Sequence, residues 1–223
     1  MPDIAADWAL IRCWLGAHLP ATLADLRPGA CADDIAAFEA AVGSAMPDGW
    51  RQLYRMSDGQ AHDRSRGAAG VWFGLGFLPL QRALRQWRSW RDIAAAADGS
   101  DETLRETYMS DAASFPAGAI RSTYASSGWI PMAEDWGGNH FGIDLAPGPD
   151  GRRGQVINFG RDEDLKVVMA PNLKAFIVWM AEELDQGGGK TVADGKGKID
   201  FELADPPGLH FLDAAKARFG PAK

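Results

Sequence analysis

The sequence predicts an α+β protein in which helices flank a mainly antiparallel sheet. Two observations lead to this fold class. Amphipathic patterns with apolar residues at helical spacing dominate residues 4–98 and return at 172–184. Between them, short connections of the kind that favour an antiparallel meander separate the strand patterns 129–133, 140–145, 154–159 and 165–170.

Four helices are expected before residue 100. The first ends near Pro20, after apolar residues at steps of three and four. Asp33 is expected to cap the second helix, and Gly43 to end it in a left-handed conformation. The third begins at Met46–Asp48, where a proline and an acid suit a first turn, and the fourth covers 81–98.

Three further segments have a less regular pattern. The segment 71–80, VWFGLGFLPL, is apolar and aromatic enough for a strand, although its glycines and proline favour an edge or a bulge. Residues 98–118 are polar and weakly periodic, so we expect an excursion with a short helix near Leu104–Met109. Asn172 is expected to cap the last long helix.

The length of 223 residues, 46% of them apolar, suits one well-packed domain or one domain with an appendage. We expect residues 1–186 to form the α+β domain. The composition changes after Gln186, so residues 187–223 are expected to form a Gly- and Lys-rich linker and a C-terminal tail, which is free to fold back on the domain.

Charge and cysteine usage exclude several classes of protein. A formal net charge of -7 argues against a nucleic-acid binder and suits either ordinary solubility or a basic protein partner. Cys13 and Cys31 have neither disulfide-framework nor zinc-site spacing. No signal-peptide pattern and no run of eighteen apolar residues occurs, so we expect a cytoplasmic protein with no membrane span, no metal and no cofactor.

The stretch WIPMAEDWGGNHFGIDL, Trp129 to Leu145, holds several polar residues that invite a catalytic interpretation. In the expected strand 140–145, His140 and Asp144 would be about 13 Å apart, too far for a hydrogen bond. Glu134 and Asp135 fall in a turn, where acids are common. A Gly-Gly-Asn hairpin is therefore favoured over an active site, and we do not expect an enzyme.

The order of motifs along the chain resembles the SUKH superfamily. The similarity rests on Pro47 with Leu53-Tyr54 in the third helix, on Asp58-Gly59 after it, and on Trp129-Ile130-Pro131 at the start of the sheet. It continues with Gly137-Gly138-Asn139, Asp144 and Gly154-Gln155-Val156-Ile157. That group includes fungal regulators of cell-wall glucan synthesis and bacterial immunity proteins against toxins. The resemblance implies an α+β domain used for binding and not for catalysis.

Six residues are candidates for contact with a partner. Polar residues in turns or strands would line one concave face beside two tryptophans: Asp58, Asn139, Asp144 and Gln155, with Trp129 and Trp136. For Asp58 and Asn139 we favour the simpler alternative that they bond the backbone in their turns. For Asp144, a buried hydrogen-bonded carboxylate and a site residue are equally open.

Three functions follow as hypotheses. The first is an immunity protein that binds and neutralises a basic toxin domain, drawn in by opposite charge. The second is a regulatory scaffold of cell-wall glucan synthesis, with the tail as a tether. The third is a small-ligand-binding or hydrolytic domain centred on Asp144, His140 and Asp58.

Overall fold

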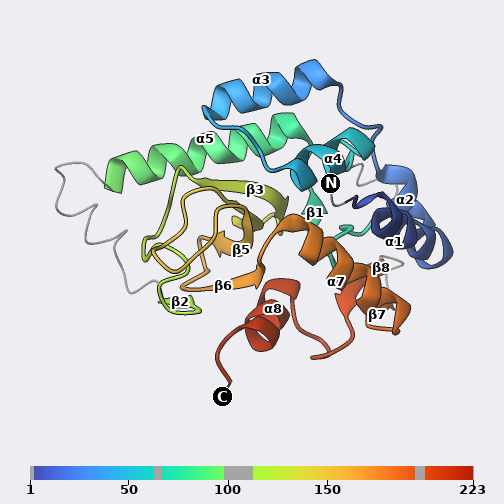
Figure 1. The fold of residues 1–223 in the computed structure, drawn as a ribbon. Coiled ribbons are helices and arrows are strands. Elements are labelled where there is room, and N and C mark those ends of the chain that lie inside the picture. Colours follow the sequence, from blue (N-terminus) through green and yellow to red (C-terminus); the bar gives the residue numbers. More distant parts are fainter. Residues whose placement is uncertain (1–2, 63–66, 98–112, 194–198, 223) are drawn as a thin grey trace.

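A computed structural model describes residues 3–62, 67–97, 113–193 and 199–222 (Figure 1). Its helices are α1 (Ala5–His18), α2 (Pro20–Asp25), α3 (Ala32–Val42), α4 (Asp48–Met56), α5 (Leu80–Ala97), α7 (Leu173–Asp185) and α8 (Phe211–Phe219). Its strands are β1 (Gly76–Phe77), β2 (Ala113–Phe115), β3 (Trp129–Glu134), β4 (Asn139–Asp144), β5 (Gln155–Gly160), β6 (Leu165–Ala170), β7 (Gly189–Ala193) and β8 (Ile199–Leu203).

The main sheet has the order β1-β3-β4-β5-β6-β2. Strand β2 runs parallel to β6, and the other neighbours are antiparallel. The sheet is therefore mixed and mostly antiparallel, which confirms the predicted α+β class. The four-strand meander β3 to β6 is also confirmed, within two residues of the predicted ranges.

Helices cover both faces of the sheet. Helix α5 contacts β3 on one face, with α3 packed beside α5, while α7 and α8 contact β6 on the other (Figure 1). Every residue of β3, β4 and β5 is consequently buried. A smaller apolar cluster on the α5 side contains Trp90, Ile120, Ala125, Trp129, Ile157 and Phe159.

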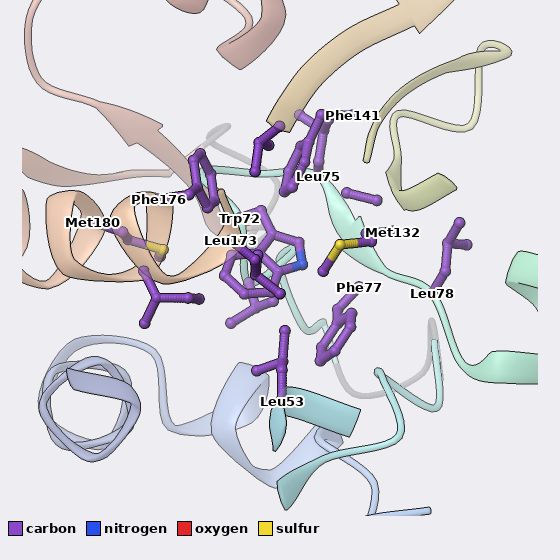
Figure 2. Close-up of a cluster of buried hydrophobic side chains, with 14 of the residues drawn as sticks. Leu53, Trp72, Leu75, Phe77, Leu78, Met132, Phe141, Leu173, Phe176 and Met180 are labelled. Carbon is purple, nitrogen blue, oxygen red and sulfur yellow. The ribbon is translucent and has the colours of Figure 1, made fainter. Parts of the chain in front are cut away.

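Trp72 lies in the middle of the main core (Figure 2). Its ring centroid is 5.2 Å from that of Phe77, 5.8 Å from Phe141 and 6.0 Å from Phe176. Of the strand predicted over 71–80, the structure forms only the two residues of β1. The predicted edge position is confirmed, because β1 is the first strand in the sheet order. Phe73 and the glycine after it have positive φ values, so the chain turns there. Phe73 lies in the same core and packs against Phe201 and Phe211 of the C-terminal segment.

The helix ends follow the expected chemistry with one correction. Gly43 is left-handed at φ 73° and ends α3, and the side chain of Asn172 accepts a hydrogen bond from the amide of Ala175 at the start of α7. The residue that caps α3 is Cys31 and not Asp33. Asp33 instead lies in the first turn, where its charge suits the helix dipole.

The C-terminal segment contains more structure than the composition indicated. Residues 189–193, expected to belong to a linker, form β7 and pair with β8. Phe201 and Phe211 are buried in the main core, and Lys216 on α8 forms an ion pair with the buried Glu163 at 3.3 Å. The tail therefore packs on the sheet.

Two other expectations concern helices. The short helix expected near Leu104–Met109 lies outside the described residues. Among the residues that are described, no helix is both long enough and apolar enough to cross a membrane.

Candidate functional site

The fold separates the six candidate residues into different places. Trp129 pairs with Asp144 across β3 and β4, and Asp144 pairs with Gln155 across β4 and β5, so these three form one row of the sheet. All three are buried, with at most 2% of each residue exposed. Side chains at this depth cannot contact a partner directly in this conformation.

Asp144 is a buried hydrogen-bonded carboxylate. Its Oδ1 accepts from the backbone amide of Ala146 at 2.9 Å, and its Oδ2 accepts from Nε2 of Gln155 at 2.9 Å. The same Nε2 donates to the carbonyl oxygen of Ala119 at 2.9 Å. Burial raises the pKa of Asp144 to about 6, although these hydrogen bonds oppose the rise. Asp144 and Gln155 thus fix the loop around Ala119 to the sheet.

Asn139 lies at the opposite end of β4 and joins two turns. Its Oδ1 accepts from the backbone amide of Asp162 at 2.8 Å, and its Nδ2 donates to carboxylate oxygens of Asp135 and Asp162. Asp135 in turn accepts from the amide of Gly137 at 2.6 Å. The hydrogen bond from Asn139 holds the pKa of Asp162 below its usual value. These contacts hold the β3–β4 turn beside the β5–β6 turn.

Asp58 bonds a backbone amide that is distant in sequence. Its Oδ1 accepts from the amide of Leu80, the first residue of α5, at 2.8 Å. A helix leaves its first amides without internal partners, so Asp58 supplies one of the acceptors that α5 needs. Its Oδ2 forms an ion pair with Arg27 at 3.2 Å. The prediction that Asp58 bonds the backbone of its own turn is therefore corrected: the hydrogen bond of its side chain is to the amide of Leu80 at the start of α5.

Trp136 is the candidate residue that the fold presents to solvent. It is 46% exposed, at the turn between β3 and β4, and its φ of 68° lies in the left-handed region. The guanidinium carbon of Arg82 lies 4.5 Å from the Trp136 ring centroid, within the range of a cation–π contact. The ring is therefore held in place while much of it stays accessible.

Arg82 is itself held by a buried acid. Its Nε lies 2.6 Å from Oε1 of Glu134, whose side chain is 3% exposed, and Nε2 of Gln86 donates to the other carboxylate oxygen. Burial raises the pKa of Glu134, whereas the charge of Arg82 lowers it. This pairing fixes the guanidinium beneath Trp136.

His62 completes this surface from a different part of the chain. Its ring packs edge-on against the Trp136 ring, with the two ring centroids 4.6 Å apart. Burial and the nearby charge of Arg82 lower the pKa of His62 to about 4, so the imidazole is neutral at pH 7. Both rings rest on Gly76, where a Cβ atom would come within 2.7 Å of His62 and 2.9 Å of Trp136. We call Trp136, Arg82 and His62 the Trp136 surface.

Sequence reasoning missed His62 and the role of Arg82. His62 stands in a loop without a periodic pattern, and Arg82 belongs to a series of arginines that spiral around their helix. A local pattern that joins either residue to Trp136 is absent from the sequence, because the contact depends on how the sheet and α5 pack.

The residues of the hydrolytic hypothesis do not come together. His140 contacts the carbonyl oxygen of Ala133 through Nδ1 at 3.1 Å, at the end of β4 opposite Asp144. Asp58 lies at the start of α5. In the part of the chain that the structure describes, no group of three or more His, Cys, Asp or Glu side chains is placed to hold a metal ion.

Fold and site together define an α+β protein in which Asp58, Asn139 and Asp144 stabilise the fold through hydrogen bonds. Its exposed tryptophan, Trp136, is held in place by contacts with neighbouring side chains. Comparison with protein families matches residues 29–179 to the SMI1 / KNR4 family (SUKH-1). The chain belongs to this family, which confirms the resemblance seen in its sequence.

Curated relatives are fungal. The chain is 34% identical over 190 residues to the cell wall biosynthesis/cell cycle regulator smi1 of Schizosaccharomyces pombe. The matched region covers 83% of this chain and 37% of that relative. It is 30% identical over 241 residues to the cell wall assembly regulator SMI1 of Saccharomyces cerevisiae, with 95% of this chain and 48% of that relative in the matched region. A glucan synthesis regulatory protein of Neurospora crassa is 30% identical over 208 residues, with 82% of this chain and 39% of that relative in the matched region. The chain thus spans less than half the length of each of these relatives.

Proposed function

We propose that this chain is a non-catalytic protein-binding domain that regulates cell-wall assembly, the role that the names of its relatives describe. The observation that carries the proposal is the exposed Trp136, held by Arg82 and His62 at the end of the sheet. The names of the relatives support the regulatory role. The Trp136 surface supports binding as the means.

An exposed tryptophan on a rigid frame suits a contact surface for a protein. Trp and Arg are among the residue types that most often dominate the binding energy of protein interfaces. All nine tryptophans lie in the described part of the chain, and the other eight are buried or half-buried. Since Trp136 is already fixed, binding would cost little of the entropy that is lost when a mobile side chain is ordered.

Affinity capture from cells that naturally express the chain tests this proposal. We expect wall-synthesis or signalling proteins to be retained by the wild type and lost from Trp136→Ala. Leu10→Ala is the matched control, since Leu10 is an exposed apolar residue on α1 at 59% exposure. If Trp136→Ala retains the same proteins as the wild type, binding does not depend on the Trp136 surface and the proposal fails.

Deletion of residues 187–223 is not a suitable test of the tethering role. The deletion would remove Phe201 and Phe211 from the main core. Lost binding would then report damage to the fold.

A second candidate function is an immunity protein that blocks a basic toxin domain. The net charge of -7 favours it, because opposite charges accelerate association and aid specificity. The same capture experiment distinguishes the two candidates. Recovery of one stoichiometric basic toxin domain, with an affinity that falls steeply as salt is added, would support immunity over wall regulation.

A further inference from the structure

A surface pocket of about 180 Å³ lies between α1, α2 and the end of α4. Leu23, Leu26 and Met56 contribute its apolar lining, and Arg12 and Arg27 contribute two guanidinium groups. Five of its seven lining residues precede residue 29, where the family match begins, so membership of the family does not assign this pocket a role.

The apolar part of the pocket is an accessible edge of the main core. Leu23, Leu26 and Met56 are partly buried and pack against that core. The pocket is partly open to solvent, and its volume of about 180 Å³ leaves room for one apolar side chain. Filling it would remove some apolar surface of Leu23, Leu26 and Met56 from water.

The charged part of the pocket is opposite in sign to the protein as a whole. The chain carries a net charge of -7, yet two arginines line this one pocket. Arg12 is exposed and, among the residues that the structure describes, has no ion-pair partner. Arg27 pairs with Asp58 at 3.2 Å but leaves 49% of its side chain exposed.

We propose that this pocket binds an acidic peptide segment of a protein partner. One apolar side chain of the peptide enters between Leu23, Leu26 and Met56, and neighbouring carboxylates pair with Arg12 and Arg27. An arginine offers several donors in a planar fork that matches a carboxylate, so the combination of lining residues favours acids beside an apolar residue. The inference rests on the proposed function as a protein-binding domain and adds the chemistry of the bound segment.

Fluorescence polarisation with labelled twelve-residue peptide pools tests the inference. Each pool has a central Leu or Phe, flanked either by Asp and Glu or by Lys and Arg, with blocked ends. We expect the acidic pool to bind at least about tenfold more tightly than the basic pool. We expect Arg12→Glu to weaken binding of the acidic pool by about tenfold or more, and Arg27→Gln to weaken it by a smaller factor.

Arg88→Glu is the matched control, because it makes the same change in net charge at an exposed arginine on α5 outside the pocket. We expect it to change the affinity for the acidic pool less than twofold. An equal loss in Arg88→Glu and Arg12→Glu would show a general charge effect and overturn the inference. Tighter binding of the basic pool, or of decanoate as a simple lipid carboxylate, would overturn it as well.

Failure of this inference can be distinguished from failure of the proposed function. If captured partners are lost from Trp136→Ala and retained by Arg12→Glu, the domain binds proteins through the Trp136 surface and the pocket has no part in it. If Arg12→Glu loses partners that Trp136→Ala retains, the pocket is a binding site and the Trp136 surface is not.

Discussion

Replacing Trp136 by glycine separates the structural role of this residue from its proposed binding role. The left-handed backbone at φ 68° costs a residue with a side chain about 1 kcal/mol or more, and glycine removes that cost. Loss of the cation–π contact with Arg82 costs about 0.5–1 kcal/mol. The buried half of the ring, roughly 100 Å², contributes about 2–3 kcal/mol more at about 25 cal/mol per Å². Because the relieved backbone strain offsets part of these losses, the free energy of unfolding should fall by about 1–3 kcal/mol.

The effect on partner affinity is separate, because it comes from the part of the Trp136 ring that is still exposed in the free protein. A fully buried tryptophan removes 150–250 Å² from water, and with 46% of Trp136 exposed a partner can cover roughly 100 Å² more. At about 25 cal/mol per Å² this gives about 2.5 kcal/mol, or a loss of affinity on the order of 70-fold in Trp136→Gly.

Two measurements check this prediction. Urea unfolding compares the stability of Trp136→Gly with that of the wild type, and titration calorimetry measures binding of the captured partner. A loss of more than about 4 kcal/mol in stability would exceed what the contacts of the Trp136 ring supply and would show that the substitution disrupts the turn itself. Unchanged affinity would refute the argument that Trp136 is a binding residue.

Three further predictions concern residues that stabilise the fold. Gly76→Ala places a Cβ atom 2.7 Å from His62, so it should cost about 1–3 kcal/mol and shift tryptophan fluorescence, and unchanged emission would contradict the close packing. Burial raises the pKa of Asp144 from 3.8 to about 6, so the folded state holds a proton that the unfolded state releases between these values. The unfolding free energy of the wild type should therefore fall by about 2 kcal/mol relative to that of Asp144→Asn as the pH rises from 4 to 6. The same pH dependence of unfolding free energy in both proteins, measured by urea unfolding, would contradict this. Lys216→Met leaves the buried Glu163 without its ion-pair partner, so it should cost about 3 kcal/mol and speed hydrogen exchange in α8, whereas exposed Lys190→Met should do neither.

The meander could be predicted because its signals are local. Alternating apolar residues and turn-rich connections mark β3 to β6, and one capping asparagine marks the start of α7. The positive φ of Phe73 has no such local signal, because residues with large side chains rarely adopt it. In the structure it accompanies the packing of Phe73 against Phe201 and Phe211, which are distant in sequence. The strand at 189–193 likewise depends on pairing with β8, which composition does not reveal.

The candidate site was predictable in its residue types and not in its geometry. Alternation along β4 correctly separates Phe141 from His140, but it does not tell which face meets solvent, and here both faces are covered. Asp144 was consequently open between two roles, and its depth in the sheet makes it a structural carboxylate. The contact between His62 and Trp136 joins residues 74 positions apart through the pairing of β1 with β3, so it required the fold.

Asp58 connects the two proposed binding surfaces. Its Oδ2 pairs with Arg27 of the pocket, and its Oδ1 accepts from the first amide of α5, the helix that carries Arg82 to Trp136. A guanidinium has five N–H donors, so Arg27 can bond a peptide carboxylate while it keeps Asp58. Occupying the pocket should therefore leave the start of α5 in place. The losses of affinity in Trp136→Gly and Arg12→Glu should then add in the double variant, and a strong departure from additivity would show that Asp58 couples the two surfaces.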